Sequence, residues 1–132
     1  MSSVLEPIPD GETEAFWAGV AEGRFLLPWC NPCGTPFWHP RAFCPRCWSE
    51  DVELRESEGS GTVYASTVVR RGALPPFDEQ LPYALAAADL DEGVRVFARV
   101  VDTDSVAIGD RVRVELRDLG GGTVPVFVPE RA

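Results

Sequence analysis

Four cysteines in two closely spaced pairs constrain this chain more than any other feature. They form Cys30-Asn-Pro-Cys33 and Cys44-Pro-Arg-Cys47, and ten residues separate the two pairs. Each pair can place two thiolates on one side of a tetrahedral ion, and the segment between the pairs is long enough for a hairpin that brings them together. The spacing therefore predicts a four-cysteine metal site at Cys30, Cys33, Cys44 and Cys47.

The residue after each pair bears on the local backbone. Gly34 follows the first pair and suits a knuckle whose chain needs a positive φ. Trp48 occupies the equivalent place after the second pair, so we expect that knuckle to be less regular.

Several kinds of chemistry use paired cysteines. The N-terminus has neither the basic nor the apolar part of a secretory signal, so we expect a reducing, cytoplasmic setting in which two disulfides are disfavoured. A redox Cys-x-x-Cys normally stands alone in a βαβ unit, which is not indicated here. Iron of the rubredoxin kind uses similar knuckles, and the sequence does not separate it cleanly from the favoured ion, zinc. Four protein ligands leave no open coordination position, so the metal is expected to be structural.

Composition narrows the class of protein. The chain has 132 residues and a net charge of −9, and all twelve of its basic residues are arginines. Such an acidic chain lacks the counterion-release term that drives non-specific nucleic-acid binding, so nucleic acid is a poor partner. The longest apolar run, residues 83–88, is far shorter than the roughly 20 residues that span a bilayer, which argues against a membrane protein.

Charge is distributed unevenly along the chain. Residues 24–48 contain three arginines and no acid, whereas residues 1–23 contain five acids and no arginine. Residues 49–58 are again acidic, with five acids against one arginine. Together with the motifs, these changes predict three parts: an N-terminal lead-in and helix at 1–24, a metal ribbon at 25–58 and a β domain at 59–132.

A short helix is predicted over residues 13–22. Thr13 suits its N-cap, Glu14 its first turn and Gly23 its C-terminal stop. So short a helix needs a surface to lie on, and its predicted apolar stripe consists of Phe16, Trp17, Val20 and Ala21.

From residue 59 onward, apolar residues alternate with a period of two. Five strands are predicted, at 62–70, 83–90, 94–101, 111–117 and 123–128. Five short strands separated by turn residues suggest a small antiparallel barrel, for which the OB-fold is the natural candidate, although an SH3-like barrel or a small sandwich has similar spacing. The proline-containing loop 71–82 is the longest connection and hence a candidate functional loop.

Aromatic residues are concentrated around the cysteines. A ribbon of this size has little interior, so we favour a protein-binding face, with purely intramolecular packing as the alternative. The eight aromatic residues between positions 16 and 48 include all four tryptophans of the chain: Phe16, Trp17, Phe25, Trp29, Phe37, Trp38, Phe43 and Trp48.

Residues for catalysis are scarce. The chain has one histidine, no lysine, no cysteine outside the two pairs and no Gly-x-Ser-x-Gly motif. His39 is expected to lie at the surface or beside a metal ligand without binding the ion itself, with a ligand or partner contact as the other interpretation. The chain is therefore not expected to be an enzyme by itself.

An ordered set of motifs resembles one family, the zinc-ribbon/OB-fold proteins associated with acyl-CoA enzymes. The resemblance runs from about residue 12 to residue 129, and its order makes it more specific than the cysteines alone. The motifs are Phe16-Trp17, Glu22-Gly23-Arg24, Cys30-x-x-Cys33-Gly34, Pro40-Arg41, Cys44-Pro45-x-Cys47, Gly59-x-Gly61-Thr62-Val63-Tyr64-x-x-Thr67, Pro82-Tyr83, Leu90-x-Glu92-Gly93 and Ile108-Gly109-x-x-Val112.

This resemblance implies a fold and a function. The implied fold is an N-terminal helix, a rubredoxin-like zinc ribbon and a C-terminal five-stranded OB-fold. The implied function is that of a non-catalytic subunit of a hetero-oligomer. A thiolase-like enzyme, namely a thiolase, an acyltransferase or a retro-aldolase, supplies the chemistry. Such complexes include aldolases of steroid side-chain degradation, and this chain would help form their acyl-CoA channel.

The resemblance also implies site residues. Phe16, Trp17, Trp38, His39 and Arg41 would face the thiolase-like partner by position. Trp38-His39 stands where a second proline is common in the family, so the channel lining is expected to differ here.

Arginines could also hold the phosphates of CoA through charge-assisted hydrogen bonds, unless they are solvated or paired with carboxylates. The candidates are Arg41, Arg46, Arg70 and Arg71. Two other functions stay open at this point: a rubredoxin-like iron electron carrier and a nucleic-acid-binding ribbon and barrel.

Overall fold

The computed structural model describes residues 8–75, 77–120 and 122–130. One helix and three strands come first, followed by five longer strands. The elements are α1 (Glu14–Ala21), β1 (Leu26–Cys30), β2 (Thr35–Pro36), β3 (Val52–Glu56), β4 (Ser60–Val69), the 3₁₀ helix η1 (Phe77–Gln80), β5 (Tyr83–Leu90), β6 (Arg95–Val100), β7 (Arg111–Asp118) and β8 (Thr123–Pro129). Within the described residues, no helix is long and apolar enough to cross a bilayer.

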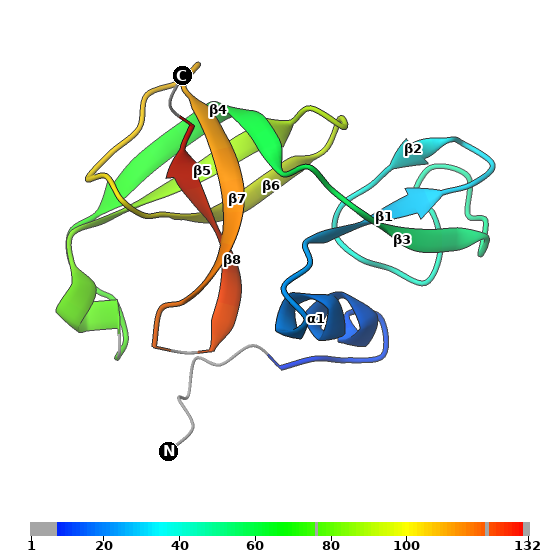
Figure 1. Ribbon diagram of the computed structural model, residues 1–132, viewed down its shortest axis with the longest axis horizontal. Coiled ribbons are helices and arrows are strands. Elements are labelled where there is room, and N and C mark those ends of the chain that lie inside the picture. The colour runs from blue at the N-terminus through cyan, green and yellow to red at the C-terminus, as the bar shows by residue number, and fades with distance from the viewer. Residues whose placement is uncertain (1–7, 76, 121, 131–132) are drawn as a thin grey trace.

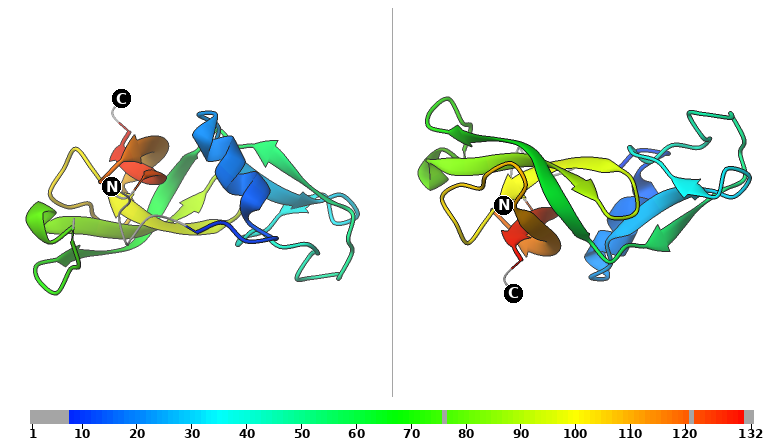
Figure 2. Two further views of the ribbon diagram at one scale, coloured as in Figure 1. Left: turned by 90° about the horizontal axis from the view of Figure 1, so that it is seen from below. Right: turned by 90° about the horizontal axis from the view of Figure 1, so that it is seen from above.

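Two sheets lie side by side along the long axis of the molecule (Figures 1 and 2). The smaller is a ribbon of order β2-β1-β3, and the larger is a closed barrel of order β4-β5-β6-β8-β7. Helix α1 contacts both, because it lies against β1 of the ribbon and β8 of the barrel. The helix therefore joins the two sheets.

A capping box between Asp10 and Thr13 lies in the turn that precedes α1. Asp10 Oδ1 accepts hydrogen bonds from the amides of Glu12 and Thr13, at 2.9 Å each, and Thr13 Oγ1 accepts one from the amide of Asp10 at 3.1 Å. Thr13 occupies the N-cap position of the regular helix, but its side chain makes no cap hydrogen bond there. The predicted N-cap position of Thr13 is therefore confirmed, but its hydroxyl bonds back to Asp10 in the preceding turn and does not cap the helix amides.

The helix ends as predicted at Gly23, whose φ is +82°. The amide of Arg24 donates to the carbonyl of Gly19 and that of Gly23 to Val20, which is the Schellman pattern. Phe16 and Val20 are buried, but Ala21 is exposed, so the predicted apolar stripe was wrong at Ala21. Gly19 is buried in its place, because α1 approaches β1 closely: a Cβ on Gly19 would lie 2.5 Å from Leu26 Cδ1.

The barrel has the connectivity of an OB-fold. Its consecutive strands β4, β5 and β6 pair antiparallel, β6 pairs in parallel with β8, and β7 closes on β4. This is a five-stranded Greek-key barrel, which confirms the OB-fold expectation over the SH3-like and sandwich alternatives. Each strand lies within two residues of its predicted bounds.

One hydrophobic core runs through helix and barrel. Phe16, Val20 and Phe25 belong to the same buried cluster as Val63, Val100 and other inward-facing residues of the barrel. Leu27 of the ribbon is completely buried in that cluster. The helix and the barrel thus bury apolar surface that neither could bury alone.

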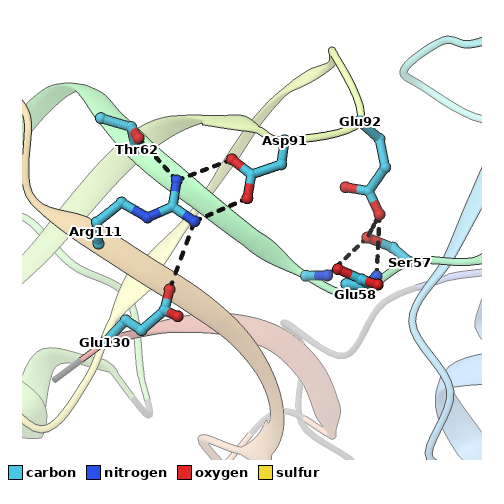
Figure 3. A network of polar contacts seen from close by, with 8 residues as sticks. Ser57, Glu58, Thr62, Asp91, Glu92, Arg111 and Glu130 are labelled. Atoms are coloured by element: carbon cyan, nitrogen blue, oxygen red, sulfur yellow. Dashed lines mark hydrogen bonds and ion pairs between the residues drawn. The ribbon is translucent and has the colours of Figure 1, made fainter. Parts of the chain in front are cut away.

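Polar contacts brace the link between ribbon and barrel. Glu92, in the turn between β5 and β6, accepts hydrogen bonds through Oε2 from Ser57 Oγ (2.8 Å) and the amide of Glu58 (3.0 Å), as Figure 3 shows. Beside it, Arg111 makes a two-pronged contact with Asp91 at 2.8 and 2.9 Å. The β5–β6 turn therefore holds both the linker and the closing strand β7.

The close approach of β4 to β5 generates a prediction. A Cβ on Gly61 would lie 2.6 Å from the carbonyl oxygen of Asp89 and 3.0 Å from Leu90 Cα, both of them backbone atoms that cannot rotate away. We expect Gly61→Ala to lower the free energy of unfolding by about 1–3 kcal/mol, measured by urea denaturation. Gly11→Ala is the control, since its added Cβ would contact nothing within 4 Å. Equal denaturation midpoints for the two variants would contradict this account.

Candidate metal centre and docking face

The first cysteine knuckle follows directly from β1. Strand β1 ends at Cys30, and the amide of Gly34 donates to the Cys30 carbonyl at 2.8 Å, which closes a tight turn around Cys33. Gly34 has a φ of +68°, a conformation that glycine adopts without steric cost. The predicted role of Gly34 is confirmed.

The second knuckle repeats this geometry. The amide of Trp48 donates to the Cys44 carbonyl at 2.9 Å, and Trp48 has a φ of +66°. The expectation of a less regular second knuckle was therefore wrong for the backbone. A tryptophan accepts the left-handed conformation here, at a cost of about 1–2 kcal/mol.

The knuckles bring all four sulfur atoms together. The four Sγ atoms lie within 4.8 Å of one another, and Cys30 Sγ and Cys47 Sγ are 3.5 Å apart. A tetrahedral ion with metal–sulfur bonds of about 2.3 Å needs sulfur atoms about 3.8 Å apart, so the donor set fits such an ion. Cys30 and Cys44 are buried, whereas Cys33 and Cys47 lie at the surface. The four-cysteine site predicted from the sequence is thus assembled at one edge of the ribbon.

Backbone amides lie close to two of the sulfur atoms and favour the thiolate form of Cys44. The amide of Cys33 lies 3.4 Å from Cys30 Sγ, and that of Arg46 lies 3.3 Å from Cys44 Sγ. Burial opposes ionisation of Cys44, but the amides of Cys47 and Arg46 outweigh it and lower the pKa of the Cys44 thiol to about 7. A lowered pKa suits metal binding, because the thiolate is the ligand. In contrast, burial raises the pKa of the Cys30 thiol, and hydrogen bonds to Cys47 and Cys30 raise the pKa of Cys33 to about 12.

The ribbon has only a small apolar cluster of its own. Cys30, Phe37 and Cys44 are its buried members, and Val52 packs against them. Two of these three buried residues, Cys30 and Cys44, belong to the four-cysteine site. The four-cysteine site therefore supplies most of this cluster, while other buried residues of the ribbon, such as Leu27, pack into the core shared with the barrel.

Four of the five predicted partner-binding residues lie in one aromatic group. The ring centroid of Phe16 lies 5.0 Å from that of Trp17 and 5.3 Å from that of Trp38. The ring centroids of Trp38 and His39 are 5.5 Å apart. Phe16 is only 4% exposed, so it packs within the chain. For Phe16 this fits the alternative of intramolecular packing better than the predicted partner contact. Trp17 and Trp38 are half-buried and His39 is exposed, so a partner could reach these three.

Arg41, the fifth of these residues, lies on a separate groove of about 410 Å³ between α1 and the ribbon. The groove also includes Glu12 and Ala15 of the helix side and Pro40 and Leu54 of the ribbon. The amide of Ala42 donates to Glu12 Oε2 at 3.0 Å, which fixes this loop against the helix.

Trp48 was not among the predicted contact residues, yet it is the most exposed tryptophan, at 72%. Its ring stacks on Phe43 with centroids 5.2 Å apart and planes at 13°. The clustering of aromatics near the cysteines contained this signal, but its outward direction depends on the left-handed backbone at Trp48.

The four arginines considered for CoA fall into two groups. Arg41 and Arg46 are exposed on the ribbon, where Arg46 Nη1 donates to Thr35 Oγ1 at 2.8 Å. Arg70 and Arg71 are exposed in the segment after β4, which lies at the end of the barrel remote from the ribbon (Figures 1 and 2). The structure does not bring the four together into one site.

Two family models match consecutive parts of the chain. Residues 17–53 match "ChsH2, rubredoxin-like zinc ribbon domain", and residues 54–117 match "ChsH2, C-terminal OB-fold domain". A solved structure titled "Ltp2-ChsH2(DUF35) aldolase" is similar over 94% of this chain and 98% of the matched chain, with a TM-score of 0.83 and 28% identity.

Two curated relatives are also similar to this chain. A "DUF35 domain-containing scaffold protein" of Methanocaldococcus jannaschii is 35% identical over 105 residues, which are 76% of this chain and 74% of the relative. A "Probable enoyl-CoA hydratase alpha subunit" of Thermomonospora curvata is 33% identical over 130 residues, or 95% of this chain. The chain spans only 40% of the length of that second relative.

The dependence of the ribbon on its sulfur site generates a prediction. When the metal-loaded chain is treated with a chelator, residues 25–56 should lose protection from hydrogen exchange while the barrel strands keep theirs. The reason is that metal binding supplies folding free energy in such segments, on the order of 10–16 kcal/mol in zinc-finger peptides. Loss of protection in both parts at once, or in neither, would contradict it.

Proposed function

The chain belongs to the DUF35 family, with the zinc ribbon and OB-fold of ChsH2, and from this premise we propose that it is a non-catalytic accessory subunit of a thiolase-like acyl-CoA enzyme. The observation that carries the proposal is the full-length likeness to a chain of the Ltp2-ChsH2 aldolase. The scaffold name of the archaeal relative supports the same role. The enzyme would be a thiolase, an acyltransferase or a retro-aldolase, including one of steroid side-chain degradation.

The residue types of this chain suit a subunit that supports an enzyme better than one that catalyses the reaction. Its only histidine, His39, is exposed, and it has neither a lysine nor a cysteine outside the sulfur site. In this proposal the partner contributes the reacting groups. This chain contributes a surface whose shape is fixed by the sulfur site on one side and by the core around Phe16 on the other.

The docking face in this proposal comprises the accessible members of the aromatic group and the loop that follows them. Trp17, Trp38 and His39 present ring edges and faces, and Arg41 adds a charged donor beside the groove. Tryptophan and arginine are enriched among residues that dominate binding energy at interfaces. Phe16 acts from below, by holding the rings of Trp17 and Trp38 in place.

Acyl-CoA would lie where this face meets the partner. Arg41 and Arg46 are on the ribbon side and could hold phosphate oxygens at the shared channel. Arg70 and Arg71 lie at the remote end of the barrel, so we assign phosphate contacts in this channel to the first two alone.

Zinc is the proposed ion of the sulfur site, held by Cys30, Cys33, Cys44 and Cys47. It would supply structural cross-linking only, because four thiolates complete its coordination. Elemental analysis of the purified chain should find one zinc per chain in a colourless protein. A red protein with one iron per chain would instead support the rubredoxin-like electron carrier.

Partner binding can be tested by co-expression with a thiolase-fold enzyme encoded beside this chain. We expect the two to co-purify, and the enzyme to lose stability or acyl-CoA turnover without this chain. The double variant His39→Ala/Arg41→Ala should bind the enzyme at least about tenfold more weakly, since both residues are exposed and only a contact would be lost.

Arg70→Ala/Arg71→Ala is the matched control, because it removes two exposed residues at the remote end of the barrel. Its affinity for the enzyme should stay at the wild-type value. An enzyme that folds and turns over equally well without this chain would overturn the proposal.

A further inference from the structure

One arginine of the barrel differs from all the others in its partners. Five arginines lie on the barrel strands, and four of them contact carboxylates: Arg95 with Asp89, Arg111 with Asp91, Arg113 with Glu115 and Arg117 with Asp102, at 2.6–2.8 Å. Arg99 on β6 forms no ion pair within the described residues, although Asp78 and Glu79 lie on the neighbouring helix η1. Its charge is thus left without a counter-ion in the described part of the chain.

The surroundings of Arg99 are aromatic and apolar. Its guanidinium carbon lies 4.2 Å from the ring centroid of Tyr83 and 5.9 Å from that of Phe77. Burial among these groups lowers the pKa of Arg99, although an arginine keeps its proton in a protein. The rings stabilise the face of the guanidinium plane, but its N–H groups point outward in that plane and need acceptors at the edge.

Only one of the three guanidinium nitrogens of Arg99 has a hydrogen-bond acceptor among the described residues. Nη1 of Arg99 donates to Gln80 Oε1, and Gln80 in turn donates through Nε2 to the Leu119 carbonyl at 2.7 Å. Nε is buried without a partner, and Nη2 makes no hydrogen bond to any residue that the structure describes. Nε and Nη2 together form the two-pronged edge that binds a carboxylate.

A pocket of about 190 Å³ lies at this arginine. Tyr83, Leu85, Val124 and Pro125 line it beside Arg99. For comparison, a closed apolar cavity of about 150 Å³ in another protein holds benzene, so this volume suits a body of one ring. A similar hollow over Ala65 and Phe97 on the same sheet contains no charged group that could select an occupant.

We propose that the Arg99 pocket binds a small monocarboxylate with a flat, ring-sized apolar body. The Arg99 side chain would turn so that Nε, which is covered in the structure, faces the pocket. The carboxylate would then accept hydrogen bonds from Nε and Nη2, and the ring would lie against Leu85, Val124 and Pro125. Exposed Arg70 and Arg71, in the segment between β4 and η1, offset the carboxylates of Asp78 and Glu79 at this end of the barrel. This site is distinct from the proposed docking face, so it does not depend on the partner enzyme.

Benzoate is the probe, titrated into the metal-loaded full chain and followed by amide chemical shifts. We expect saturable binding with shifts centred on Tyr83, Leu85 and Leu119. Benzyl alcohol has the same ring without the charge and should bind at least about tenfold more weakly, because a charge-assisted pair is lost. This comparison needs no variant, so it holds even if a substitution at Arg99 impairs folding.

Two variants locate the site. Arg99→Gln should weaken benzoate binding at least about tenfold. Arg95→Gln on the same strand should leave it unchanged, since Arg95 also stacks on a tyrosine but has Asp89 as its partner. No saturable binding at millimolar benzoate, equal binding of benzyl alcohol, or equal loss in both variants would overturn the proposal.

Discussion

Convergence of four sulfur atoms on one point takes the place of a hydrophobic core in the ribbon. The buried cluster that belongs to the ribbon alone has three members, and two of them, Cys30 and Cys44, are part of the four-cysteine site. Because the metal site fixes the chain there, the aromatic residues of this region need not all turn inward. Some, such as Phe25, join the core of the barrel, while Trp38 and Trp48 keep surface that a partner can use.

Local patterns in the sequence predicted a large part of this fold. The two cysteine pairs specified the sulfur site, because ligand spacing along the chain determines which atoms can converge. Alternation of apolar residues gave the five barrel strands, and Gly23 gave the end of the helix. These features depend on neighbours close in sequence, for which period and turn chemistry are reliable guides.

Features that depend on distant contacts were beyond the sequence. The approach of Leu26 to α1 explains why Gly19 rather than Ala21 is buried, and no pattern within the helix contains that information. The left-handed Trp48 contradicts the usual preference for glycine, because the second knuckle imposes its backbone whatever residue follows. Likewise, the solitary charge of Arg99 appears only once the partners of every other barrel arginine are known.

The contact between Glu92 and the linker has a mechanical consequence. The chain passes from ribbon to barrel only once, at residues 57–59, and a single crossing of this kind would ordinarily act as a hinge. Here the Glu92 carboxylate of the barrel accepts hydrogen bonds from Ser57 and Glu58 of the connecting segment, and helix α1 contacts both sheets. These two attachments oppose bending of the connecting segment, so a force on the far end of the ribbon is transmitted to the barrel and does not simply change the angle between the two sheets.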